Sequence, residues 1–164
     1  MAILNRKSFL LAATVATVLG LGACATVPAP SHLADTVARK PELSTLNRLL
    51  QQSGLSDTLR SGSTLTVFAP SDEAFKAVPA KTMAELSANP ELLKSVLTYH
   101  VLPTKLTAAQ VKNSSVKTVQ GANLALATAG TFVTVEDAVV TQADVDATNG
   151  VLHVIDKVLI PPKR

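Results

Sequence analysis

The chain has 164 residues, with 15 basic and 12 acidic side chains, one cysteine and no tryptophan. This length predicts one domain that can bury its own core, and a single cysteine excludes an intramolecular disulfide framework. The formal charge of +3 falls to +1 without Arg6 and Lys7, which belong to the N-terminal segment described next. The remaining charge is too small, and aromatic residues are too few, for a nucleic-acid-binding surface.

The N-terminal segment has the features of a secretory signal. Asn5–Lys7 forms a positive head, and Phe9–Leu21 is an uncharged, mostly apolar run. This run is too short to span a hydrocarbon core of ~30 Å. It leads into Leu21–Cys24 (LGAC), which resembles the lipobox of bacterial lipoproteins, where the cysteine receives lipid after the chain is cut before it. We therefore predict a cleaved signal peptide over residues 1–23 and lipidation of Cys24; an ordinary secretory signal beside a chance cysteine is the alternative.

Residues 24–32 follow as the lipidated cysteine and a flexible tether, because small side chains and two prolines do not favour a packed element. The folded domain is then expected over residues 33–162. Ala25 stands after the cysteine, where an aspartate often marks retention in the inner membrane. We therefore expect a lipid-anchored protein of the cell envelope, on the outer membrane, facing either the periplasm or the cell surface.

Helices are predicted for most of the first half of the domain. Pro41 favours a helix start, and Gly54 favours its end before a second short helix. The apolar stripe of the first of these helices consists of Leu43, Leu46, Leu49 and Leu50. Alternation predicts one strand over 64–69, which Pro70 ends, and Ser71 is placed to cap the next helix.

Further capping signals follow along the chain. A short helix is expected after Pro79, and Asn89-Pro90 predicts the start of another, because a capping side chain precedes a proline at the first helical position. His100 lies on the apolar stripe of that helix. Thr107 and Gln110 have the spacing of a capping box for a short helix.

The second half changes to strand patterns. Glycines and an Asn-Gly pair separate five apolar runs rich in valine and threonine. The predicted strands are 116–120, 124–128, 131–135, 139–145 and 151–160. Helices followed by strands indicate an α+β fold rather than alternating α/β units.

Three segments resemble the fasciclin-like (FAS1) domain family. They are Thr66–Phe75 (TVFAPSDEAF), Leu97–Pro103 (LTYHVLP) and Ala147–Asp156 (ATNGVLHVID), in the family's order and at domain-length spacing. The likeness covers about residues 33–162. It implies a FAS1-type β-sandwich or wedge with helices packed against it, which agrees with the helical first half and strand-rich second half.

The resemblance also implies a role in adhesion and protein–protein contact, without catalysis. Family members in animal matrix place partner contacts near the Tyr-His segment and near an Asp-Ile step. The matching residues here are Tyr99, His100, Asp144 and Val145. Because the residues around Asp144 depart from the matrix motif, we carry over a partner-binding surface for an unknown protein or surface ligand, and not the matrix ligand.

Other chemistries are weakly indicated. His100 and His153 share apolar faces, so both are predicted to be core histidines that bond to backbone, and no metal or other cofactor is expected. A hydrolase triad could be drawn from Ser71, His100 and Asp156, yet no nucleophile-elbow motif supports it. We therefore predict a non-enzymatic, lipid-anchored interaction module for adhesion or protein binding, and keep a carrier of an apolar small ligand as the alternative.

Overall fold

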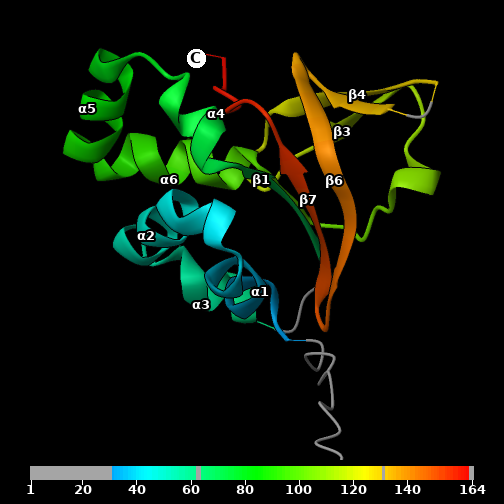
Figure 1. The fold of residues 1–164 in the computed structure, drawn as a ribbon, viewed down its shortest axis with the longest axis horizontal. Helices are drawn as coiled ribbons and strands as arrows, with labels where there is room; N and C mark the ends of the chain where they lie inside the picture. The colour runs from blue at the N-terminus through cyan, green and yellow to red at the C-terminus, as the bar shows by residue number, and fades with distance from the viewer. Residues whose placement is uncertain (1–30, 62–63, 131, 163–164) are drawn as a thin grey trace, which may run out of the picture.

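The computed structural model describes residues 31–61, 64–130 and 132–162 (Figure 1). Helices dominate its first half, as predicted, and one strand interrupts them. In chain order the elements are α1 (Leu33–Arg39), the 3-10 turn η1 (Pro41–Leu43), α2 (Ser44–Gln52), α3 (Leu55–Arg60), β1 (Leu65–Pro70), α4 (Asp72–Lys76), α5 (Ala80–Ala88) and α6 (Pro90–Tyr99).

The second half supplies most of a seven-stranded sheet. Its elements are β2 (Val101–Leu102), η2 (Ala108–Gln110), β3 (Ser114–Lys117), β4 (Asn123–Ala129), β5 (Phe132–Val135), β6 (Ala138–Ala147) and β7 (Gly150–Ile155). The strand order is β2-β1-β7-β6-β5-β4-β3. This arrangement confirms the predicted α+β class.

The predicted helix starts are confirmed by their capping contacts. The Ser71 hydroxyl accepts a hydrogen bond from the N–H of Ala74, and the Asn89 side chain caps α6. Both partners of the Thr107–Gln110 capping box are formed at η2. These side chains satisfy N–H groups that a helix leaves without an internal partner, so local sequence is sufficient to position these turns.

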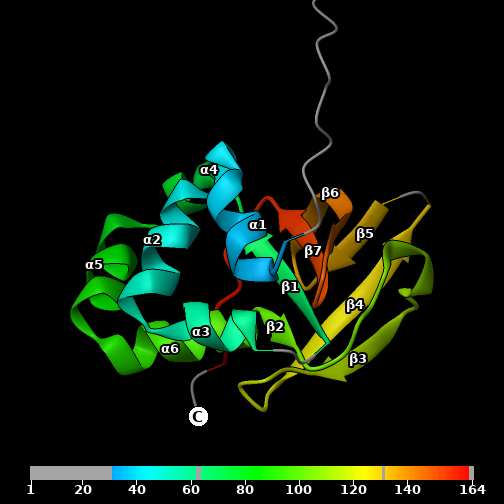
Figure 2. The same cartoon turned by 90° about the horizontal axis from the view of Figure 1, so that it is seen from below.

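The centre of the sheet is a parallel pair between β1 and β7. Leu65 pairs with Gly150 at one end and Pro70 with Ile155 at the other. Every residue of both strands is buried. Figure 2 shows the reason: the helices lie on one side of these strands and the hairpin strands β3–β5 on the other.

Two apolar clusters cover the two faces of β1. Val67 and Ala69 pack with the leucines of α1, α2 and α3, whereas Phe68 packs with residues of β4, β5 and β6. The second cluster can form because the sheet bends at β6, where the register with β7 shifts twice between Val140 and Val145. The bend produces the wedge expected from the sequence.

The main differences between the structure and the sequence prediction concern α1, β2, β3 and β7. Helix α1 was not predicted, because it has only seven residues and its apolar pattern is therefore short. Strand β2 was not predicted either, because it has only two residues. Strand β3 runs over Ser114–Lys117 instead of the predicted 116–120. Strand β7 ends at Ile155 and not at Ile160, because the following segment turns toward α6.

The predicted signal peptide, Cys24 and most of the tether lie outside the described residues. Ser31 and His32, assigned to the tether, are described and contact the turn between β6 and β7: the N–H of Thr148 donates to the Ser31 carbonyl at 3.0 Å. Within the described ranges, no helix combines the length and apolarity that crossing a membrane demands.

Candidate functional site

Tyr99 and His100 stand at the end of α6, and the structure buries both. Their exposed fractions are 3% and 2%. The Tyr99 hydroxyl lies 3.1 Å from the carbonyl oxygen of Asn123 and 3.3 Å from Oε1 of Glu136. Burial, reinforced by the Glu136 carboxylate, raises the pKa of Tyr99 to about 12. Tyr99 therefore remains a neutral hydrogen-bond donor at physiological pH.

His100 connects α6 to the C-terminal segment. Its Nδ1 lies 2.7 Å from the carbonyl oxygen of Val96, and its Nε2 accepts a hydrogen bond from the N–H of Leu159 at 3.0 Å. Because one partner can only accept and the other can only donate, the ring is neutral with its proton on Nδ1. Burial lowers the pKa of His100 to about 4. These contacts confirm the predicted core histidine.

His153 has the same role in β7, with the opposite tautomer. Its Nδ1 accepts from the N–H of Asp144 at 3.2 Å, and its Nε2 donates to the carbonyl of Leu106 at 2.8 Å. Its ring stacks on Phe68 with centroids 5.5 Å apart. The prediction that His153 is structural is confirmed.

Asp144 and Val145 lie in the irregular part of β6. Asp144 is exposed and has a φ of 54°, and its carboxylate accepts a hydrogen bond from the N–H of Ala108 at 2.8 Å. Val145 is half-buried against the helical cluster. The four residues suggested by the resemblance therefore occupy two separate environments: Tyr99 bonds toward β4 and the β5–β6 turn, whereas Asp144 supports η2.

The residues of the conceivable hydrolase triad bond to separate backbone groups. Ser71 caps α4, His100 holds Leu159, and the Asp156 carboxylate accepts from the N–H of Val139 at 2.7 Å. Among the described residues, no group of three or more His, Cys, Asp or Glu side chains is arranged to hold a metal ion.

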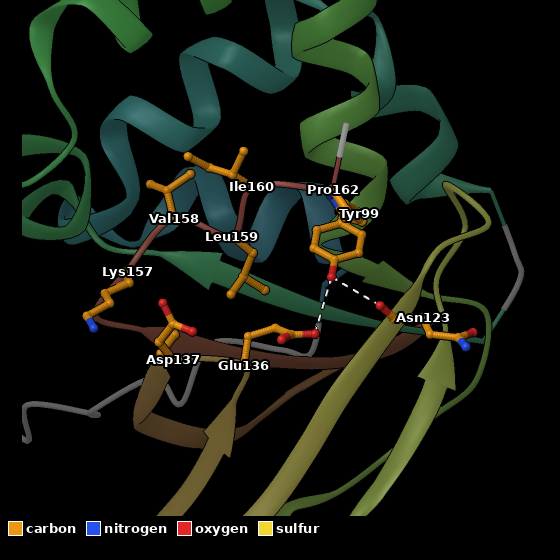
Figure 3. Close-up of a pocket in the computed structure, with 10 residues that line it drawn as sticks. Tyr99, Asn123, Glu136, Asp137, Lys157, Val158, Leu159, Ile160 and Pro162 are labelled. Carbon is orange, nitrogen blue, oxygen red and sulfur yellow. Dashed lines mark hydrogen bonds between the residues drawn. The ribbon is translucent and has the colours of Figure 1, made fainter. Parts of the chain in front are cut away.

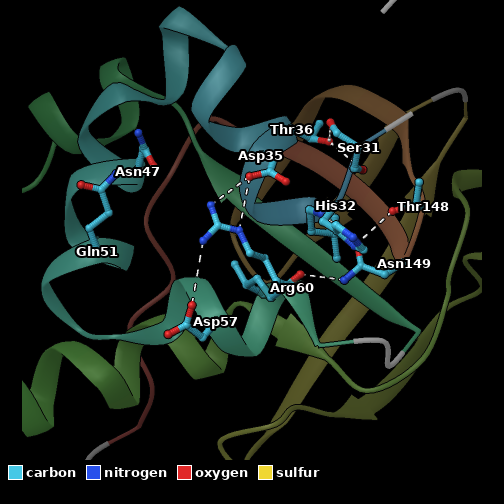
Figure 4. A network of polar contacts seen from close by, with 12 residues as sticks. Ser31, His32, Asp35, Thr36, Asn47, Gln51, Asp57, Arg60, Thr148 and Asn149 are labelled. Carbon is cyan, nitrogen blue, oxygen red and sulfur yellow. Dashed lines mark hydrogen bonds and ion pairs between the residues drawn. The ribbon is translucent and has the colours of Figure 1, made fainter. Parts of the chain in front are cut away.

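Asn149 joins three segments, and sequence reasoning gave it only a turn. Its Oδ1 accepts from the N–H of Leu33 at 2.9 Å, and its Nδ2 donates to the carbonyls of Leu59 at 2.6 Å and Ser61 at 3.3 Å. Figure 4 shows this network beside Arg60, whose guanidinium contacts Asp35 at 2.9 Å. The Asn-Gly pair was correctly predicted to form a turn. No local sequence pattern indicates which backbone groups bond to the Asn149 side chain.

A groove of about 400 Å³ lies over Tyr99 (Figure 3). We call it the Tyr99 groove. Its acidic side is the β5–β6 turn, Glu136 and Asp137, and its other side is the segment 157–162 that follows β7. Glu136 has a φ of 52°, which is unusual for a residue other than glycine. Its Oε1 also accepts from the N–H of Ala125 at 2.8 Å, so two contacts hold this side chain in place.

An apolar crevice lies elsewhere, between α3 and β2. Its volume is about 30 Å³, and its lining includes Leu55, Leu59, Val101 and Val119. Pockets that enclose a drug-sized ligand usually measure about 300–1,000 Å³. An apolar carrier would therefore have to widen this crevice.

Comparisons with known proteins agree with the fold. The family model described as "Fasciclin domain" matches residues 41–161. Protein sll1483 of Synechocystis sp. is 41% identical over 132 residues, covering 79% of this chain and 73% of that protein. The cell surface glycolipoprotein MPB83 of Mycobacterium bovis is 34% identical over 141 residues, covering 83% of this chain and 63% of that protein. A solved FAS1 domain pair from the insect cell adhesion molecule Fasciclin I has a similar fold, with a TM-score of 0.64 at 19% identity, covering 80% of this chain and 51% of that chain.

Proposed function

This chain belongs to the fasciclin domain family, and we propose that it is a non-catalytic interaction module held in the cell envelope by lipid on Cys24. Its role would be adhesion or protein binding. The observation that carries this proposal is that polar residues of the three family segments form hydrogen bonds within the fold. Ser71, His100, His153 and Asn149 all bond to backbone groups. They therefore shape the fold, which leaves the surface for binding.

The anchor is supported by the signal and lipobox pattern and by the likeness to a protein named as a cell surface glycolipoprotein. Its direct test is metabolic labelling with a radioactive fatty acid. The native chain should take up label, and Cys24→Ser should not. Equal labelling of both chains, or of neither, would contradict the anchor.

Adhesion is tested by a clean deletion in the native host. We expect attachment to cells or surfaces, or biofilm cohesion, to fall, and the native gene to restore it. Unchanged attachment would count against an adhesive role. Protease treatment of intact and permeabilised cells separates the two orientations, because only a domain facing the medium is cut on intact cells.

The apolar lining of the crevice beside α3 is the observation that favours a second candidate, the carriage of an apolar small ligand for which the crevice would widen. Protein purified from the native host would then retain a lipid or chromophore in a native mass spectrum. A spectrum of the unliganded domain alone would exclude this candidate.

A further inference from the structure

The Tyr99 groove lies at the end of the molecule away from Ser31. In Figure 1 the chain enters α1 near the turn between β6 and β7, and the C-terminal segment lies at the opposite end of the sheet. Ser31 is seven residues after Cys24, so an anchor on that cysteine keeps this end within about 25 Å of the lipidated residue. If the anchor of the proposed function is present, the groove therefore lies at the end of the domain farther from the point of attachment.

One side of the groove is an aliphatic ridge. Leu159 is buried and held by His100, which leaves Val158 half-buried and Ile160 59% exposed. The same two side chains border a second hollow of about 240 Å³, whose other side is Ala77–Pro79. Val158 and Ile160 therefore line both hollows and are accessible there to an apolar side chain of a partner.

The facing side is acidic. Glu136 and Asp137 form the two-residue turn between β5 and β6, and both are exposed. Tyr99 and Ala125 both donate hydrogen bonds to Oε1 of Glu136, so its carboxylate is positioned before any partner arrives. Lys157 is the one basic residue of the groove lining. Two carboxylates against one amine leave the groove with a formal charge of −1.

We propose that the Tyr99 groove binds an extended segment of a partner protein, which places a basic side chain against Glu136 and Asp137 and an aliphatic side chain against Val158 and Ile160. Charge complementarity favours this occupant over an anionic lipid surface or a nucleic acid, because the carboxylates would repel phosphate. The ridge between two hollows favours successive side chains of a peptide over one compact ligand. This inference rests on the proposed interaction function, and it specifies the binding surface and the chemistry of the partner.

The test is site-specific photo-crosslinking of the full chain in the native host. A photoreactive amino acid replaces Ile160, and in a matched control it replaces Phe132. Phe132 is 62% exposed but lies in the β4–β5 hairpin, away from the groove lining. We expect a protein adduct from position 160 and not from position 132, with the crosslinked peptide containing lysine or arginine.

A charge reversal then tests the acidic side. Asp137→Lys should lower the yield of the adduct at position 160 by about tenfold, because it replaces attraction with repulsion. Asp57→Lys is the control: this side chain is 93% exposed on α3, and its reversal should leave the yield unchanged. Thermal unfolding of both variants checks that they fold alike.

Several outcomes would overturn the inference. They are the absence of a protein adduct at position 160, equal adducts at positions 160 and 132, an adduct with a second copy of this chain or with a lipid, and an adduct insensitive to Asp137→Lys. If deletion of the gene abolishes attachment while no adduct forms at position 160, the proposed function stands and the groove assignment fails.

Discussion

At each end of the molecule a buried polar side chain holds separate segments together, an amide at one end and an imidazole at the other. Near Ser31, the Asn149 amide accepts from the N–H of Leu33 and donates to the carbonyl of Leu59. Near the groove, the His100 imidazole accepts from the N–H of Leu159 and bonds to the carbonyl of Val96. Each side chain is buried, both donates and accepts hydrogen bonds, and joins segments that are distant in sequence.

The two side chains differ in whether they take up a proton as the pH falls. An amide keeps its donor and acceptor at every physiological pH, whereas an imidazole exchanges its acceptor for a second donor when it takes up a proton. A protonated His100 would direct an N–H at the N–H of Leu159. The contacts of Asn149 should therefore be insensitive to pH, whereas the contacts of His100 should weaken in acid. Four predictions follow for the two ends, and those at Asn149 and His100 test the difference in pH dependence.

The largest effect is expected at the turn beside Asn149. A Cβ on Gly150 would lie 1.9 Å from the carbonyl oxygen of Leu65, so Gly150→Ala must separate β1 from β7. We expect a loss of about 5 kcal/mol in the free energy of unfolding, or failure to fold. Gly130→Ala is the control: its φ is 64°, no atom lies within 4 Å, and the cost should be about 1 kcal/mol. Urea unfolding that gave equal losses for both variants would refute the steric argument.

Asn149→Ala should cost about 3 kcal/mol, because it leaves the N–H of Leu33 and the carbonyl of Leu59 without their partner. Urea unfolding measures the loss, which should be the same at pH 7 and pH 5. Asn47→Ala serves as control and should change stability little, because this half-buried side chain of α2 accepts a solvent-exposed hydrogen bond from Gln51. A loss below about 1 kcal/mol for Asn149→Ala would show that water or a shift of α1 replaces the amide.

His100 should make stability depend on pH. Its pKa is about 4 in the folded protein and 6.5 in the unfolded chain, so the unfolded state binds the extra proton first as pH falls. Its contribution is therefore present above pH 6.5 and is lost progressively between pH 6.5 and pH 4. We expect a loss of about 2 kcal/mol between pH 7 and pH 5.

Stability is compared above pH 5 because the contributions of Glu42 and Asp72 do not change there. Hydrogen bonds lower the pKa of Glu42 and Asp72, so their contributions are lost only as pH falls below the usual carboxyl range. His100→Gln should be less stable at pH 7 but should lose less between pH 7 and pH 5. A variant with the full native slope would assign the acid sensitivity to another group.

The smallest effect is expected at Tyr99. Tyr99→Phe removes the hydroxyl that contacts Asn123 and Glu136 but keeps the buried ring. The free energy of unfolding should fall by about 1 kcal/mol, because Glu136 retains its bond from Ala125. Chemical denaturation measures this loss. A cost near 3 kcal/mol would mean that the hydroxyl is essential to the whole β5–β6 turn.

Sequence reasoning succeeded where the signal is local. The caps at Ser71 and Asn89 and the box at Thr107 depend on residues two or three positions apart, and all were predicted. Strand β1 was predicted from alternation, but the burial of both its faces was not, because that requires knowledge of what covers the sheet. The parallel partner of β1 has no local signal either.

The functional surface was harder to predict. Asn149 contacts Leu33 across 116 residues, and a simple Asn-Gly turn explains its sequence equally well. The Tyr99 groove combines the end of α6, the β5–β6 turn and the C-terminal segment, which no spacing rule brings together. Of the suggested binding residues, Tyr99 and His100 are buried and Asp144 is exposed, and their partner contact remains a prediction.

If the chain is exported as predicted, the parallel pairing of β1 with β7 has a consequence for its transit. Leu65 meets Gly150, 85 positions later, so the central ladder cannot close until almost the entire polypeptide is available. Such distant pairing is slow to form, because a long loop must close before any contact stabilises it. A chain threaded through a translocation channel from its N-terminus would remain unfolded during transit, and folding would finish only on the far side.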